Sequence, residues 1–463
     1  MPIDLRFQDS ALGTEVNCNG VETGAASVGS RLIEYKPRPA KRDQKDQWQD
    51  VDETALVQYT TMALAESAVQ SLNRYFEAAR LAEARVMLHP GVFQRYRGDT
   101  SKTLYRSPVL NGYAHYEQTK LPARVRINWK RRYYMEQDAE AAVTWSDGTT
   151  TAKTVTINGA SNVLQLQTSA IAGELEAPIR FSITNNYNNV VGVNDIHIGQ
   201  LRGAASNWNG LLEAESAGGS INNAGTNSSD GTCSNGQYHT ATAYSINAGW
   251  FTTLPDDPLY VMRRVWILST SQLSAINGRK IKPFLRFRAA PAADIQVAFW
   301  LGYGAGGYSD QWIWRGDWQD AQQAAFDNFL EGNAFDVPYV ALDAGQSVSG
   351  YTLGLAVRKA TATDSTVQLD YVQLMPLDGY KRLDTLLSSA AYNEVVDESD
   401  IEPIAFARSG TSKRRQYRID GRGVFVRPGE NAWLYFQARD YSTSAIARTL
   451  SVLAYYRPRR LTL

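Results

Sequence analysis

The apolar residues of the N-terminal third recur first at helical spacing. They lie three or four positions apart, with two further residues widening the stripe: Leu64, Ala68, Leu72, Tyr75 and Ala79, with Val69 and Phe76. This stripe predicts one long helix between about residues 52 and 88, packed on the sheet of its own domain. A coiled coil is the alternative, but it would need more sustained heptads. We expect Asp52 or Thr54 to cap the helix and Pro90-Gly91 to end it.

After the helix the period changes from 3.6 to 2. In residues 124–130 apolar and polar side chains alternate, which predicts a half-buried antiparallel strand. Similar short runs predict further strands at 154–157, 163–166, 179–183, 285–287, 295–301, 353–357, 367–369, 433–436 and 449–456. Repeated short strands with turns between them are typical of a β-sandwich, most simply a jelly roll. The fold class is therefore mainly β.

Two polar stretches interrupt these patterns. Residues 1–50 read as a short strand or two followed by an extended arm, which is either a solvated loop or an arm that grips a partner. Residues 204–236 are rich in Asn, Gly and Ser and predict a long surface loop or a domain boundary.

These stretches suggest a domain division. We expect a strand and arm at 1–50, a helix plus β domain at 51–205, a β-sandwich at 206–376, similar to a carbohydrate-binding module, and a β segment at 377–463. The last segment has too few strands to bury a core alone, so it is expected to complete the domain that residues 51–205 begin, with the sandwich inserted.

The charge composition limits the partners that the sequence predicts. Lys plus Arg equals Asp plus Glu at 47 each, so no overall field draws the chain to nucleic acid or to an anionic membrane. No run approaches the ~20 apolar residues that span a bilayer, and the N-terminus has no secretory pattern. We therefore expect no membrane partner, no sequence-specific nucleic acid, and a protein that is made in the cytosol. Cys18 and Cys233 form no CxxC, and the sequence leaves their pairing open.

Motifs for catalysis are missing from the sequence. The four histidines show no metal-ligand spacing, and neither a GxSxG elbow nor a Walker A loop occurs. We expect no catalytic residue, metal or cofactor, and no enzyme. The basic end at Arg457, Arg459 and Arg460 is expected to form salt bridges with a neighbouring subunit.

One dense aromatic cluster stands out: Tyr303, Tyr308, Trp312, Trp314 and Trp318. Three interpretations remain open. The rings pack in a core, anchor a protein interface, or stack on the sugar rings of a host-surface glycan.

Six stretches together resemble the structural tail proteins of long-tailed, siphovirus-like bacteriophages, and most closely the distal tail protein type. They are residues 71–80 (SLNRYFEAAR), 105–112 (YRSPVLNG), 125–134 (VRINWKRRYY), 177–185 (APIRFSITN), 369–379 (LDYVQLMPLDG) and 456–461 (YRPRRL). The loop near Ser220 and the aromatic cluster have no counterpart in this resemblance.

The resemblance implies a virion structural protein of the tail, assembled in the host cytoplasm. Its ring-forming β-barrel or sandwich domain, with one long helix and an inserted jelly roll, would associate with itself in a ring of about six copies. That ring would link the tail tube protein to the tail tip or hub protein of the baseplate. Alternatives are a glycan-binding host-recognition module and another virion component, such as a decoration or tube protein.

Overall fold

The protein is described by a computed structural model. It describes residues 3–9, 15–18, 29–35, 38–43, 47–79, 84–90, 105–137, 139–157, 162–186, 193–204, 208–216, 225–246, 261–303, 312–321, 328–339, 351–361, 363–387, 394–397, 405–409, 412–416, 419–439 and 449–461. The fold is mainly β, with 59% strand and 10% helix and with sheets that curl into half-barrels. The mainly β class expected from the alternating strands is confirmed.

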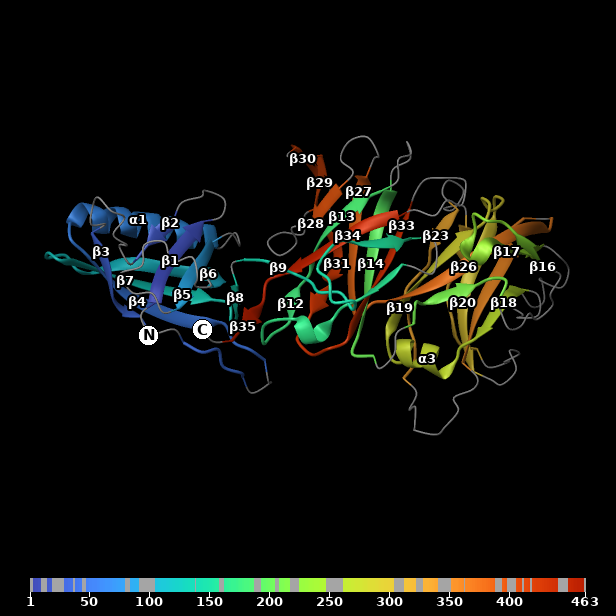
Figure 1. The fold of residues 1–463 in the computed structure, drawn as a ribbon, viewed down its shortest axis with the longest axis horizontal. Coiled ribbons are helices and arrows are strands. Elements are labelled where there is room, and N and C mark those ends of the chain that lie inside the picture. The colour runs from blue at the N-terminus through green and yellow to red at the C-terminus, as the bar shows by residue number, and fades with distance from the viewer. Residues whose placement is uncertain are drawn as a thin grey trace.

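Strand pairing gathers the described elements into three bodies that follow one another along the long axis (Figure 1). The N-terminal body comprises residues 3–137 and the C-terminal strand β35 (Arg459–Arg460). The central body comprises residues 141–202 and 379–456. The distal sandwich comprises residues 211–376.

The N-terminal body is a nine-stranded sheet with one helix on it. Its core path runs β2-β1-β5-β6-β7-β4-β3, and β8 and β35 pair beside β6. The elements are β1 (Ile3–Asp9), β2 (Glu15–Asn17), β3 (Ser30–Tyr35), β4 (Val51–Tyr59), α1 (Met62–Ala79), β5 (Ala84–Pro90), β6 (Tyr105–Gln118), β7 (Ala123–Arg131) and β8 (Met135–Gln137). The arm predicted within residues 1–50 therefore contains three strands.

The predicted helix is real but shorter than expected. Residues 51–59 alternate between buried and less buried positions and form strand β4, so Asp52 and Thr54 lie in a sheet and cap nothing. The hydroxyl of Thr61 accepts a hydrogen bond from the Leu64 amide at 3.3 Å and caps the helix instead. Pro90 ends strand β5 and not the helix.

Helix α1 is held on the sheet by packing and by one amide. Leu72 and Phe76 are buried on its inner face. A Cβ on Gly112 would lie 2.5 Å from the Phe76 ring, so β6 needs glycine there to admit the helix. Asn73 forms a pair of hydrogen bonds with the Ala114 backbone, at 2.9 and 3.2 Å, which satisfies strand groups from the helix side.

The central body packs two sheets face to face. One has the order β10-β34-β13-β28-β29-β30, with β9 beside β34, and the other has β11-β33-β14-β27-β31; β12 pairs β32. The strands are β9 (Ala141–Ala142), β10 (Lys153–Thr156), β11 (Val163–Gln165), β12 (Ala177–Pro178), β13 (Arg180–Asn185), β14 (Val193–Arg202), β27 (Gly379–Leu387), β28 (Glu394–Asp397), β29 (Ala405–Ser409), β30 (Ser412–Gln416), β31 (Ile419–Gly423), β32 (Phe425–Val426), β33 (Ala432–Arg439) and β34 (Thr449–Tyr456). Phe181, Ile198 and Phe436 lie in the core between the sheets.

The distal sandwich also has two layers, joined by a short parallel pairing of β17 with β25. Its strands are β15 (Leu211–Glu213), β16 (Thr226–Ser229), β17 (Gln237–Ser245), β18 (Met262–Ile267), β19 (Lys280–Phe287), β20 (Ile295–Tyr303), β21 (Trp312–Arg315), β22 (Gln319–Asp320), β23 (Phe329–Glu331), β24 (Phe335–Asp336), β25 (Tyr351–Lys359) and β26 (Ser365–Pro376). Helix α3 (Thr270–Ile276) begins with a capping box made by Ser269 and Gln272. The stretch 204–236, predicted as a loop, contributes β15 and β16 to these layers, a correction to the sequence interpretation.

The joint between central body and sandwich, called the outer joint, is apolar and buried. It is formed by Leu201, Ala204, Trp433 and Tyr435 of the central side and by Ala275, Phe284, Phe329 and Met375 of the sandwich. Tyr371 and Gln373 reach across it to Ile157 and Gln437. A buried apolar contact of this kind fixes the orientation of two bodies.

The joint between N-terminal and central bodies, called the inner joint, is made by strands and charges. Strand β35 pairs with β8, and the Arg459 guanidinium lies 3.2 Å from Glu136 and 3.9 Å over the Tyr134 ring. Arg457 lies 3.5 Å from Glu140. Arg457 and Arg459 therefore have partners within their own chain, and their salt bridges with a neighbouring subunit stay a prediction.

Candidate functional site

The three tryptophans of the predicted aromatic cluster do not share one face. Trp314 pairs with Leu301 and stacks on Phe335 at 4.3 Å, against the inner core of the sandwich. Trp312 pairs with Gly302, and the register shifts between these two pairs. Because such a bulge inserts one extra residue, it turns Trp312 to the opposite face of the sheet from Trp314.

Trp312 and Trp318 pack on the outer face around the buried Trp300, at ring-centroid distances of 5.5 and 6.5 Å. Arg358 lies 4.0 Å over the Trp318 ring. Both outer rings are half-buried, so part of each remains in contact with solvent. Tyr308 lies outside the described residues, and for Tyr303 the structure gives only its backbone pairing with Tyr351.

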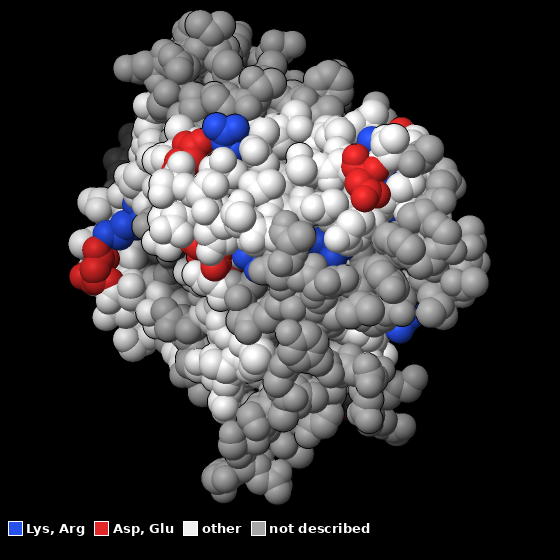
Figure 2. Space-filling view, turned by 90° about the vertical axis from the view of Figure 1, so that its right-hand side faces the viewer, with Lys and Arg blue, Asp and Glu red and all other residues white. Residues whose placement is uncertain are grey.

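Charged side chains are scattered and few among the described residues at the sandwich end of the molecule (Figure 2). Half-buried aromatic rings with arginines beside them suit a protein interface or a sugar ring. Which of the two it serves stays a prediction.

A buried carboxyl cluster in the sandwich was missed in the sequence. Asp370 is fully buried on β26 and accepts a hydrogen bond from the Ser234 amide at 2.9 Å. Glu213 of β15 accepts one from the Ser234 hydroxyl at 2.7 Å. Arg286 lies 3.5 Å from Asp370. These residues are distant in sequence, so no local motif could have revealed them.

Burial shifts the protonation of this cluster. It raises the pKa of Asp370 to about 8, against the opposing effect of Arg286, and the pKa of Glu213 to about 7. Both carboxyls therefore hold protons at a pH where ordinary carboxyls are ionised. The nearby Cys233 thiol is also buried, and its pKa is raised to about 12 by that burial. Cys233 and Cys18 are both free thiols.

The second polar cluster missed in the sequence lies at the outer joint. His197 of β14 is fully buried, bonds to the Tyr380 hydroxyl at 2.7 Å and packs on Phe284 at 5.0 Å. Burial lowers its pKa to about 3, so the ring is neutral near pH 7. Glu331 of the sandwich lies 3.7 Å from His197 Nε2, pairs with Lys282 and lies 3.8 Å from Arg382 of the central body.

The described residues contain no group of three or more His, Cys, Asp or Glu side chains suited to hold a metal ion. No helix in the described part of the chain is long and apolar enough to cross a membrane.

Comparison with known proteins found no matching family model and no significant match among curated proteins. Among solved structures, the SPP1 Dit protein (gp 19.1), described as a paradigm of the hub adsorption apparatus in phages infecting Gram-positive hosts, aligns over 99% of both chains at 5% identity with a TM-score of 0.30. The baseplate of phage P2 in its activated conformation aligns over 99% of this chain and 98% of the other, at 8% identity and a TM-score of 0.26. The structure of infectious bursal disease virus, Gx strain, aligns over 69% of this chain and 82% of the other, at 8% identity and a TM-score of 0.16. Scores this low do not establish a shared fold, so the functional argument rests on the protein's own residues.

Proposed function

We propose that this protein is a structural subunit of a bacteriophage tail, an adaptor ring at the distal end that links the tail tube to the tail tip. The proposal rests on the six stretches that resemble distal tail proteins. The observation that carries it is where three of them lie: residues 71–80, 105–112 and 125–134 form helix α1 and strands β6 and β7, which pack on one another. Segments separate in sequence thus make one structural core.

Of the remaining three stretches, two connect the bodies and one lies within the central body. Residues 369–379 run from the end of β26 into β27, between sandwich and central body, and residues 456–461 include β35 at the inner joint. Residues 177–185 form β12 and β13 of the central body. In the proposed ring, the partners are other copies of the chain, the tail tube protein and a tail tip or hub protein.

Electron microscopy of the purified full-length chain tests this proposal. The expected particle is a closed ring of about six copies, since cyclic symmetry satisfies the same interface on every copy. Gold-labelled antibodies should then mark the distal end of the tail in intact virions. Labelling along the tube or over the head would instead support a tube or decoration protein. Light scattering that shows only monomer at high concentration would argue against both.

We further propose the domain division in which residues 206–376 are inserted between 51–205 and 377–463. Supporting it, β14 pairs with β27 and β33, and β13 pairs with β34, so central sheets draw strands from both sides of the sandwich. Deleting residues 377–463 should then unfold the central-body part of the first segment, residues 141–202. A fragment 1–205 that unfolds cooperatively, with the stability it has in the full chain, would refute the division.

A second candidate function is glycan recognition by the distal sandwich. Trp312 and Trp318, half-buried on its outer face, favour it. Binding on a glycan array that is lost in Trp312→Ala and kept in Ile313→Ala, a neighbouring exposed residue, would support it.

A further inference from the structure

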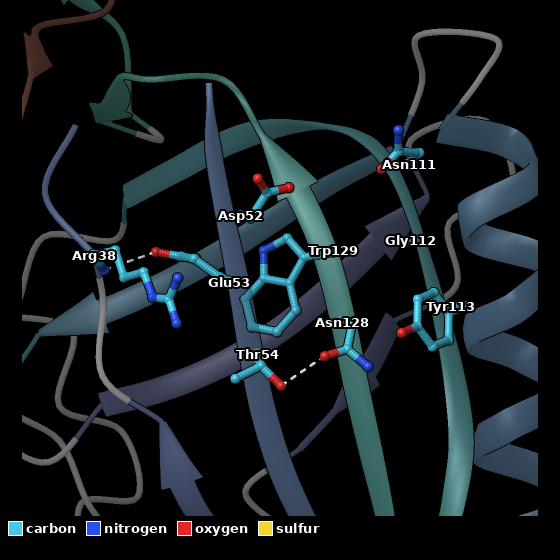
Figure 3. A pocket seen from close by; sticks show the side chains of 9 residues that line it. All are labelled: Arg38, Asp52, Glu53, Thr54, Asn111, Gly112, Tyr113, Asn128 and Trp129. Atoms are coloured by element: carbon cyan, nitrogen blue, oxygen red, sulfur yellow. Dashed lines mark hydrogen bonds between the residues drawn. The ribbon is translucent and has the colours of Figure 1, made fainter. Parts of the chain in front are cut away.

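The N-terminal body carries a cavity of about 280 Å³ over strands β4, β7 and β6 (Figure 3). This body and the sandwich lie at opposite ends of the molecule (Figure 1). Its lining is Arg38, Asp52, Glu53, Thr54, Asn111, Gly112, Tyr113, Asn128 and Trp129. We call it the cross-strand trench.

Strand register explains why a trench forms here. Glu53, Trp129 and Gly112 are paired in one row across the three strands. Glu53 and Trp129 are buried on the helix side, and a Cβ on Gly112 would point at Phe76 of α1. This row therefore directs its side chains inward and leaves backbone as the floor. The outward side chains of the rows on either side form the walls, about 7 Å apart along each strand.

The walls offer donors, acceptors and one ring. Asp52 and Asn111 lie on one side, and Thr54, Asn128 and Tyr113 on the other. The Thr54 hydroxyl donates to the Asn128 carbonyl oxygen at 2.9 Å, which orients the Asn128 amide and leaves its N–H groups to donate elsewhere. The Tyr113 side chain is 57% exposed, unusually high for a large aromatic residue.

The trench carries charges of both signs. Glu53 is already paired with Arg131 at 3.0 Å and accepts from the Tyr35 hydroxyl at 2.9 Å. Among the lining residues that leaves Asp52 and Arg38, and the half-buried Lys130 pairs with Asp52 and Asn111 in the same row of one wall. These mixed charges single out neither a cation nor an anion, whereas a carboxylate, an amide and an exposed ring together suit hydroxyl groups and the apolar face of a sugar ring.

We propose that the cross-strand trench binds a neutral, hydroxyl-rich ligand the size of a single sugar ring. Asp52 accepts from ligand hydroxyls, the Asn128 amide donates to them, and Tyr113 covers one face of the ring. Binding in the trench requires neither ring assembly nor the sandwich tryptophans.

The test is a titration of the full-length protein with glucose, galactose, N-acetylglucosamine and rhamnose, followed by saturation-transfer NMR. At least one sugar should bind, and Tyr113→Ala should weaken it about five- to tenfold, as expected for losing one ring contact. Asp52→Asn, which keeps the shape and removes the charge, should also weaken it. Gln58→Ala, a half-buried position on β4 outside the trench, is the matched control and should bind as the parent does.

Trp312→Ala should likewise leave this binding unchanged, which separates the trench from a glycan site on the sandwich. Tyr113 and Asp52 are exposed, so their variants should keep the parent's melting curve. The proposal is overturned if none of the four sugars binds the parent, or if binding survives both Tyr113→Ala and Asp52→Asn unweakened.

Discussion

The two joints of this molecule connect its bodies in opposite ways. At the outer joint, Phe284, Trp433 and Tyr435 belong to one apolar cluster drawn from both the central body and the sandwich. At the inner joint, the apolar clusters stay separate: the N-terminal cluster ends at Met135 and the central one starts at Val143 among the described residues. There a two-stranded pairing and the Arg459–Glu136 ion pair make the link.

The difference predicts how each joint responds to force and to mutation. Buried apolar area is nondirectional and close-packed, so the central body and sandwich should move and unfold together. The inner joint has a short strand pairing and a few ion pairs but no shared apolar cluster, so the N-terminal body should pivot and unfold separately. The four predictions below follow from this contrast.

The largest effect is expected for Phe284→Ala at the outer joint. The ring is fully buried and packs on Phe329 at 5.5 Å, so its loss should cost about 3–5 kcal/mol. In urea unfolding, the single transition of central body and sandwich should separate into two. Phe287→Ala removes an equal ring from the sandwich core on the same strand, and should destabilise the sandwich without separating the transitions. Equal behaviour of the two variants would refute the coupling.

Leu72→Ala should destabilise the N-terminal body alone, by about 2–5 kcal/mol, because Leu72 is fully buried between α1 and the sheet. Calorimetry should show the N-terminal transition moving down while the shared transition of the central body and sandwich stays in place. Leu64→Ala, at a position 41% exposed on the same helix, should change stability by less than about 0.5 kcal/mol. A shift of every transition would show that the inner joint couples the bodies after all.

The sandwich should lose stability as pH rises. The pKa of Asp370 is raised from 3.8 to about 8 in the folded protein. The stability that comes from its bound proton is therefore fully present below the unfolded pKa and is lost as pH rises through the folded pKa. Between pH 5 and 8 the unfolding free energy should fall by about 1 kcal/mol per pH unit. Asp370→Asn, which takes up no proton, should remove the part of the slope that Asp370 contributes and leave the part from Glu213, in urea titrations at several pH values. A parent whose stability is constant over this range would refute the assignment.

The smallest energetic effect is expected for Arg459→Ala at the inner joint. The ion pair is mostly buried, with side chains 14% and 6% exposed, but Glu136 keeps a second cation, Arg106, at 3.5 Å, so the cost should be about 1–3 kcal/mol. Small-angle scattering should nevertheless show a wider spread of shapes. Lys153→Ala, which removes a solvent-exposed pair within the central body, is the control and should leave the scattering unchanged.

The alternating strands were predictable because one side of each faces solvent or a less buried layer. Strand β7 alternates over its whole length, and it was found in sequence. The start of α1 was misplaced because Leu56 interrupts the alternation of β4, where Ala55, Leu56 and Val57 are buried in succession.

The sites were much less predictable than the strands. The outer joint uses strands buried on both faces, such as β26, whose residues 369–376 are all buried and show no period that marks a contact surface. The carboxyl cluster joins Glu213, Ser234 and Asp370 from three separate segments. The bulge that turns Trp312 away from Trp314 depends on pairing with β20, so the sequence cluster suggested one surface where the fold makes two.

The two chain crossings into the sandwich lie side by side. Gln200, near the end of β14, bridges to Leu377, just before β27, and the Asp378 amide donates to the Gln200 carbonyl at 3.1 Å. A pull on the sandwich would therefore enter the central body through the ends of two adjacent strands, along their length. The hydrogen bonds of β14 to β33 and of β27 to β31 would then be loaded in shear and would share the force, instead of breaking one after another. The sandwich is thus anchored to withstand traction.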